Sequence, residues 1–490
     1  MEVYDKKALW AGLVYFAVMV AAMRYTGGAG FAIFIPLVLL AVLQNRVEKL
    51  MLLMLVTVVA TVGNGVLMPK TTIASASQKL VLMMSAVMLL VKLMGRRHSR
   101  LVTPLLGMLV YLFFMVLSSL QGWSPLISGM KMVLFSAGYF AFYALANAVI
   151  LDRATSTRKI RAIYLSACCF LIFGSMLLLP FPGISQMQME EYVEAVKAGA
   201  NVTSLFCGMT FHPQAFGPLV GTMFVLILAD MLFSVRKVNK LMFALLLCCP
   251  FLIYKTSSRT ALGTMLAGTM YVMYLFMKTR QIGARWKNKV VSIGLMTLML
   301  FSVALMVTPG GRKSAAQFLT KRAPEEVAEV SVESVVSSRQ GLMESALYNF
   351  RQKPIIGNGF QVSKSMEGSE RGGLRSILSA PVEKGVWLTA VLEEGGIVGW
   401  SIFVLFIVVA LQKLVQRKGY CSASVFFTIV VLNMGEFTMF SVSGIGGFYW
   451  CLCFVGAIMD AHRLREMNLT YFIMSASDMG PQPVWGWRGP

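Results

Sequence analysis

The sequence has few charged residues, and acidic residues are especially scarce. Charged side chains make up 13% of the 490 residues, against 57% for apolar ones, and the mean hydropathy is +0.70. A soluble globular protein is about a quarter charged, so this chain lacks the polar side chains needed to cover a water-facing surface. The composition therefore excludes an ordinary soluble enzyme, and its apolar richness excludes a disordered chain.

The sequence also lacks the cysteine and histidine patterns that bind metal. It has eight cysteines and three histidines, with no Cys-x-x-Cys pair and no zinc-type spacing. Most of the cysteines sit inside apolar runs, so we interpret them as small packing residues. The apolar stretch after residues 1–7 has no convincing cleavage site and is interpreted as a retained first span.

Long apolar segments dominate what remains. A helix needs about 20 mostly apolar residues to cross a bilayer, and on that criterion the sequence predicts an all-α polytopic membrane protein with about 14 transmembrane helices. The predicted spans are 8–25, 29–45, 49–68, 79–95, 101–121, 126–150, 160–180, 213–234, 240–256, 261–278, 290–308, 386–412, 421–440 and 445–461. They divide the chain into N-terminal helices (1–180), a loop (181–212), a second group of helices (213–308), a large loop (309–385), C-terminal helices (386–461) and a tail (462–490).

The positive charge is distributed unevenly along the chain. The net charge of +22 arises from 44 Lys and Arg against 22 Asp and Glu. Cations gather in the connections that follow even-numbered spans, namely 44–49, 92–100, 153–161, 236–240, 278–289 and 413–418. The positive-inside rule places these connections and both termini in the cytoplasm. We therefore expect the basic residues to meet the lipid bilayer rather than nucleic acid, and the two long loops to face outward.

The first outward loop ends in a rigid return to the membrane, Thr210-Phe211-His212-Pro213-Gln214-Ala215-Phe216-Gly217-Pro218. A histidine here can bind a phosphate oxygen or a sugar hydroxyl, or shuttle a proton. The alternative is that His212 is an interfacial structural residue, with Gln214 as its partner in capping the next helix.

A short outward turn between the ninth and tenth spans carries Lys255 and Arg259. Ser257 and Ser258 can cap the tenth span, whose N-terminus then directs its amide dipole outward. The two cations beside that N-terminus predict a seat for an anion. The alternative is that both side chains simply extend to the membrane interface.

The large loop contains a predicted surface helix and a glycine turn. Apolar residues recur at helical spacing between 338 and 350, with Arg339 in the first turn of that segment. The turn Pro354-Ile355-Ile356-Gly357-Asn358-Gly359-Phe360 follows, and its two glycines permit a close backbone approach. Further on come Arg375, the pair Glu383-Lys384, and a span beginning with Glu393-Glu394-Gly395-Gly396. We interpret Glu393 and Glu394 as capping or pairing residues.

Four of these segments together resemble the bacterial O-antigen ligase and polysaccharide polymerase superfamily. They are the His212-Pro213-Gln214 return, the Ser258-Arg259-Thr260 turn, the Arg339 helix with its glycine turn, and the Glu394-to-Gly399 start of a late span. The resemblance covers roughly residues 200–410. It implies a GT-C-like, metal-independent glycosyltransferase of the bacterial inner membrane that needs no cofactor and works at the periplasmic face.

The resemblance also implies the substrates. Donor and acceptor are undecaprenyl-diphosphate-linked glycans, and a chain-length regulator and a flippase are candidate partners. Ligases of the superfamily carry a His-Asn pair shortly before the late span, whereas this chain has Glu383, Lys384 and Gly385 there. This departure favours a polymerase of surface or exported polysaccharide over a ligase that transfers the glycan to lipid A core or to protein.

The chemistry of glycosyl transfer from a diphosphate then assigns an expected role to each candidate residue. The leaving diphosphate needs cations, for which Arg259 and Arg339 are the first candidates; Lys255, Arg375 and Lys384 stand behind them. The acceptor hydroxyl needs a base, for which the candidate is Glu383, held ionised by its neighbour Lys384. His212 is the alternative base or a phosphate ligand, and Glu383 alternatively forms only a salt bridge with a loop cation.

A transporter of lipid-linked sugars is the alternative from another class. The sequence shows no pseudo-repeat, and charges within its predicted spans are sparse, which disfavours this alternative. Lys131 is the exception, because it lies inside the sixth span near the outer end. We expect its side chain to extend to the interface.

Overall fold

The computed structural model describes residues 3–44, 46–69, 71–93, 99–152, 155–186, 206–233, 239–256, 258–279, 332–364, 384–441 and 444–478. For 90–93, 332–339 and 468–478 it describes the backbone alone. Across these ranges the chain is helical, and its only extended pairings are two isolated bridges, Gly63 with Thr210 and Gln186 with Phe206. The all-α prediction is confirmed for the described part of the chain.

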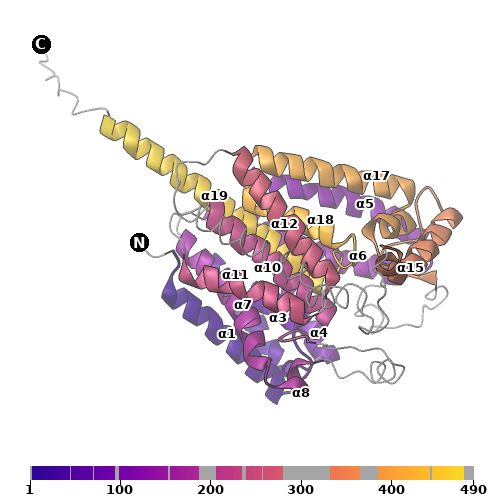
Figure 1. The fold of residues 1–490 in the computed structure, drawn as a ribbon, viewed down its shortest axis with the longest axis horizontal. Coiled ribbons are helices and arrows are strands. Elements are labelled where there is room, and N and C mark those ends of the chain that lie inside the picture. The colour runs from indigo at the N-terminus through magenta and orange to yellow at the C-terminus, as the bar shows by residue number, and fades with distance from the viewer. Residues whose placement is uncertain are drawn as a thin grey trace, which may run out of the picture.

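The helices run in chain order from α1 to α19 (Figure 1). They are α1 (Lys6–Tyr25), η1 (Ala29–Ile33), α2 (Phe34–Leu43), α3 (Val47–Val62), α4 (Thr72–Leu93), η2 (Thr103–Leu106), α5 (Gly107–Leu120), α6 (Pro125–Leu151), α7 (Thr157–Leu178), α8 (Pro182–Ser185), α10 (Pro213–Phe233), α11 (Lys240–Lys255), α12 (Arg259–Lys278), α15 (Val332–Gln352), α17 (Trp387–Gln416), α18 (Tyr420–Leu432) and α19 (Ile445–Asp478).

Within the described residues, nine segments are helical, long and apolar enough to cross a membrane, as a polytopic membrane protein requires. Two shorter apolar helices, Ala29–Leu43 and Tyr420–Leu432, fall on further predicted spans. The predicted span 290–308 lies outside the described residues, and every other predicted span coincides with a helix. The total of about 14 spans stays a prediction.

Burial separates central helices from peripheral ones. The apolar windows of α10 and α19 are 100% buried, whereas those of α1 and α17 are 28% and 33% buried. The outer helices expose large apolar side chains such as Phe113 on α5 and Leu405 on α17. In a bilayer these faces meet lipid, so the apolar excess of the sequence is divided between the protein core and a lipid-facing surface.

Contacts between helix termini define two ends of the bundle. At one end, which we call the basic end, α1 and α7 begin and α10 finishes: Arg161 donates to Val3 O (2.9 Å) and pairs with Asp230 (2.8 Å). Lys159 pairs there with Glu48 at the start of α3 (3.2 Å). At the opposite end α10, α12 and α17 begin, and α15 lies beside α17 (Figure 1). The described parts of the predicted cytoplasmic connections 44–49 and 153–161 thus lie at one end of the bundle, together with the end of α10.

Candidate functional site

At the opposite end, the glycine turn 354–361 is locked into a break in α17. Gly396 has φ 61° and ψ −168°, which interrupts the helix. Such a break leaves backbone groups without partners inside the helix. The turn supplies them: Asn358 N donates to Glu393 O (2.9 Å), Gly359 N donates to Glu394 O (3.1 Å), and Ile397 N donates to Pro354 O (2.8 Å).

Two glycines make this close approach possible. A Cβ on Gly396 would lie 2.3 Å from Ile355 O, and one on Gly357 would lie 2.4 Å from Glu394 O. Both residues also have positive φ, which glycine adopts at little cost. The close approach that the sequence indicated for the turn is therefore present, and its partner is the start of α17.

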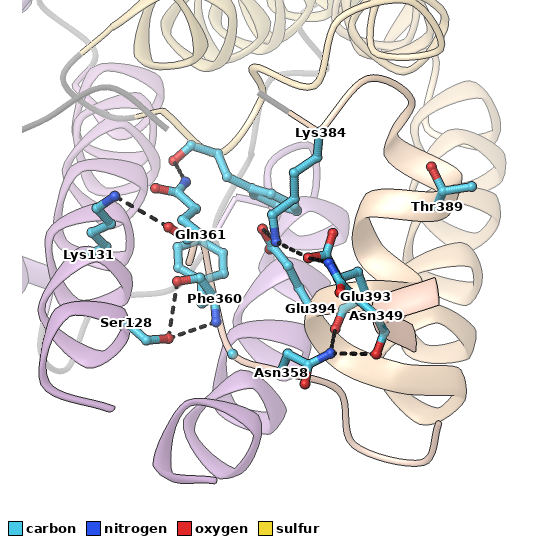
Figure 2. Close-up of polar contacts among 12 residues, drawn as sticks. Ser128, Lys131, Asn349, Asn358, Phe360, Gln361, Lys384, Thr389, Glu393 and Glu394 are labelled. Atoms are coloured by element: carbon cyan, nitrogen blue, oxygen red, sulfur yellow. Dashed lines mark hydrogen bonds and ion pairs between the residues drawn. The ribbon is translucent and has the colours of Figure 1, made fainter. Parts of the chain in front are cut away.

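The turn is anchored on its other side to α5 and α6. Ser118 donates its hydroxyl to Glu394 O and accepts from Gly359 N (3.1 Å). Ser128 accepts from Phe360 N (2.7 Å) through its hydroxyl oxygen, as Figure 2 shows. Three helices and one turn are thus joined by buried hydrogen bonds, which fixes the positions of the side chains around them.

A buried ionic cluster lies directly above this junction. Lys384 Nζ is 3.1 Å from Glu394 Oε1 and 3.5 Å from Glu393 Oε1, and its side chain runs down between the two glutamates (Figure 2). Asn349 on α15 donates to Glu393 Oε1 (3.1 Å). The exposed fractions are 4% for Lys384, 3% for Glu393 and 0% for Glu394. The interpretation of the two glutamates as pairing residues is confirmed, and their partner is Lys384.

The cluster contains polar atoms without ordinary hydrogen bonds. Among the described residues, neither oxygen of Glu394, nor Lys384 Nζ, nor Asn358 Oδ1 has a hydrogen-bond partner of good geometry. Unsatisfied buried polar groups are rare in native proteins, and each calls for an explanation such as a bound water or ion. Such atoms in one place make this cluster a candidate functional site, in which Glu394 Oε1 and Lys384 Nζ remain ion-paired.

Lys131 on α6 adjoins the cluster. Its Nζ donates to Gln361 O (3.3 Å), and 4% of the residue is exposed. It also interacts electrostatically with Glu394 and Lys384. The expectation that Lys131 extends to the interface is therefore wrong, because its ammonium is held inside the protein by the carbonyl of the glycine turn. Gln361 is itself fixed by its amide, which donates to Phe440 O (2.5 Å).

The other segments that carry the resemblance connect to this junction. The His212 return packs on the Ser258 turn, since a Cβ on Gly217 would lie 2.8 Å from Ser258 Cβ. The 433–441 loop continues the contact, because a Cβ on Gly435 would lie 2.6 Å from Thr260 Cγ2. The same loop accepts a hydrogen bond from Trp387 N at Asn433 O (2.9 Å). Segments far apart in sequence thus form one continuous set of contacts.

His212 has a clear structural role at the start of α10. Gln214 N donates to His212 Nδ1 (3.0 Å), which caps the helix. Because Nδ1 accepts this bond, the neutral ring carries its proton on Nε2. This arrangement matches the structural alternative for His212 and leaves the base role without geometric support at Nδ1.

The remaining predicted residues are placed as follows. Arg259 begins α12, which Ser258 caps by accepting from Ala261 N (3.3 Å). Lys255 ends α11 with its Nζ over the Phe251 ring (5.7 Å). Arg339 lies on α15, where only the backbone is described. Glu383 and Arg375 lie outside the described residues.

The last candidates are the cysteines and the possible metal ligands. All eight cysteines are free, and seven are buried. Burial raises the pKa of the Cys207 thiol to about 11, and its Sγ donates to Ser185 O (3.1 Å), so it packs rather than reacts. Within the part of the chain that is described, no group of His, Cys, Asp and Glu is arranged to hold a metal ion.

Sequence comparison finds no matching protein-family model and no matching curated protein. The residues of the site must therefore support any functional proposal.

Proposed function

We propose that the protein is a GT-C-like membrane glycosyltransferase that polymerises undecaprenyl-diphosphate-linked oligosaccharide units at the outer face of a bacterial inner membrane. The observation that supports this most is the junction between the glycine turn and the break in α17. It joins two of the four segments behind the resemblance, and contacts through the 433–441 loop join the other two. Both termini lie in the cytoplasm under this proposal.

The reaction needs no metal. The oxygen of an acceptor hydroxyl attacks the anomeric carbon of the donor sugar, and the bond from that carbon to the diphosphate oxygen breaks. The leaving group is undecaprenyl diphosphate, whose charge Arg259 and Arg339 stabilise, with Lys255, Arg375 and Lys384 as further cations. The hydroxyl proton passes to a base, for which Glu383 is the first candidate.

A transporter of lipid-linked glycans is the second candidate, and the break in α17 is the observation that favours it. Transporters often place broken helices beside buried charges at their binding sites. Here Gly396 interrupts α17 two residues after the buried Glu394. The charges within spans are thus less sparse than the sequence suggested, which weakens the argument against a transporter.

Reconstitution of the purified protein in liposomes with a lipid-linked oligosaccharide separates these candidates. A ladder of lipid-linked products without a second protein supports the polymerase. Transfer of single units to lipid A core supports the ligase. Movement across the bilayer with no new glycosidic bond supports the transporter, and it would overturn the proposal.

Arginine variants test the proposed cation roles. Arg259→Ala and Arg339→Ala should abolish the polymer while membrane insertion is retained. Arg351→Ala, in the last turn of α15, and the exposed Arg158→Ala at the basic end are matched controls that should keep full activity. Unchanged amount and length of polymer in both test variants would remove these residues from the mechanism.

A further inference from the structure

Two buried lysines outside the large loop extend the positive charge beside the ionic cluster. Lys79 on α4 is 6% exposed and Lys131 on α6 is 4% exposed. They interact electrostatically with each other, and Lys131 also interacts with Lys384. Transferring an ammonium out of water is costly unless an opposite charge compensates it, so the burial of Lys131, which donates its hydrogen bond to a neutral carbonyl, needs a reason.

The three lysines lie at one level of the bundle. Lys79 and Lys131 each lie about 10 Å beyond the first residue of their helices, at 1.5 Å per residue, and so does Glu394 beside Lys384. Helices α4, α6 and α17 all begin at the opposite end, since Trp123 N near the start of α6 donates to Asn358 O (3.1 Å) and Gly28 at the turn before η1 lies against Ala74 of α4. The positive ends of the dipoles of α4, α6 and α17 therefore lie at the same end of the bundle as the three lysines.

The carboxylates of the cluster do not satisfy Lys131. Glu393 and Glu394 are both within ion-pair distance of Lys384. In the described part of the chain, the one hydrogen bond that Lys131 Nζ makes is to the neutral carbonyl of Gln361, at 3.3 Å. An ammonium has three donors, so Lys131 retains capacity to bind an anion beside Lys384, with which it interacts electrostatically.

We propose that Lys131, together with Lys384 and Lys79, forms a binding site for the phosphate groups of a diphosphate ester. Lysine is a good phosphate ligand because it acts as a compact charge with three donors. The proposal deepens the proposed function by naming where the diphosphate is held, and it rests on that function only for the identity of the natural ligand. Lys384 then exchanges part of its pairing with Glu394 for pairing with phosphate.

Binding to the full-length protein in a phosphate-free detergent tests the site. The probes are farnesyl diphosphate and inorganic diphosphate, with oleate as an anionic lipid that carries no phosphate. We expect Lys131→Met to weaken diphosphate binding about tenfold or more, as the loss of a charged hydrogen bond predicts. Lys278→Met, which changes an exposed lysine in the last turn of α12, is the matched control and should bind like the unaltered protein.

The two diphosphates identify the source of the ligand. Binding of farnesyl diphosphate alone indicates the lipid-linked carrier, and binding of both indicates that free diphosphate also occupies the site; each outcome supports the proposal. Equal binding of oleate, unchanged affinity in Lys131→Met, or no binding to the unaltered protein would overturn it.

The unfolding temperature of Lys131→Met shows whether a loss of binding is caused by misfolding. Without ligand, Lys131→Met should unfold at a higher temperature than the unaltered protein, because it removes a buried charge that lacks a paired carboxylate of its own. Lys131→Arg retains the charge and should retain binding. A lower unfolding temperature in Lys131→Met, with binding intact in that variant, would make Lys131 a structural residue. Binding without polymer formation would leave the site in place and refute the proposed function alone.

Discussion

Buried carboxylates have different hydrogen-bond partners at the two ends of the bundle. At the basic end, Asp230 accepts two hydrogen bonds from Arg161 (2.8 and 3.0 Å) and one from Tyr164 (2.5 Å). Asp460 accepts from Cys421 N (3.1 Å) and from Ser422 N (2.9 Å). At the opposite end, the equally buried Glu394 pairs with Lys384 (3.1 Å), but neither of its oxygens has a well-aligned hydrogen bond among the described residues.

This difference separates a structural role from a functional one. A buried charge is tolerated for stability when its lone pairs are all satisfied, as at Asp230. Unsatisfied groups cost stability, and proteins keep such groups chiefly where function requires them. We therefore infer that Asp230 serves stability, and we propose a functional role for Glu394; the basic end also contains unsatisfied atoms, on Arg463 and His462.

The largest expected effect is a difference in the free energy of unfolding between two carboxylate-to-amide substitutions, one at each end of the bundle. Asp230→Asn should lower the free energy of unfolding by about 3–5 kcal/mol, because it leaves Arg161 buried without its carboxylate. Glu394→Gln should change it by less than about 1 kcal/mol, since Lys384 keeps Glu393 and the lost oxygen was poorly bonded. Polymer formation should nevertheless fall in Glu394→Gln. Unfolding of both variants in mild detergent gives the comparison.

A double variant checks the cause at the basic end. Arg161→Met combined with Asp230→Leu replaces the pair by apolar side chains and should recover most of the lost stability. Equal losses in Asp230→Asn and Glu394→Gln would show that both clusters are structural, and the division between the two ends would then be abandoned.

The sequence predicted the helices well because apolar length is a strong local signal. It predicted pairing as one of two roles for Glu393 and Glu394, without their partner Lys384, and it predicted a close backbone approach at the glycine turn, because glycine tolerates such contacts. It did not predict that Lys131 and Lys79 are buried beside the ionic cluster. Their importance depends on the packing of α4, α6 and the glycine turn, which no local pattern encodes, although a lysine within a span is itself a signal of function.

The second-largest expected effect concerns the break in α17 at Gly396, in the junction at the opposite end. Gly396→Ala should destabilise the protein by about 1–3 kcal/mol from backbone strain alone, and the contact with Ile355 O adds to this. Gly263→Ala on α12 is the matched control, because nothing lies within 4 Å of its added Cβ; it should stabilise the helix by about 0.5–1 kcal/mol. If Gly396→Ala were as harmless as Gly263→Ala, the junction would not depend on the break.

The smallest expected effect tests whether His212, at the opposite end, only caps α10 or also takes part in the reaction. His212→Ala should cost about 1 kcal/mol, because it removes the acceptor of the Gln214 N–H at the start of α10. Asparagine is among the best capping residues, so His212→Asn should restore that stability without restoring a proton acceptor. Full polymer formation in His212→Asn would assign His212 to structure alone, whereas recovered stability with lost polymer would return it to the chemistry as a phosphate ligand or proton shuttle. Thermal unfolding and the liposome assay, measured on the same preparations, distinguish the two.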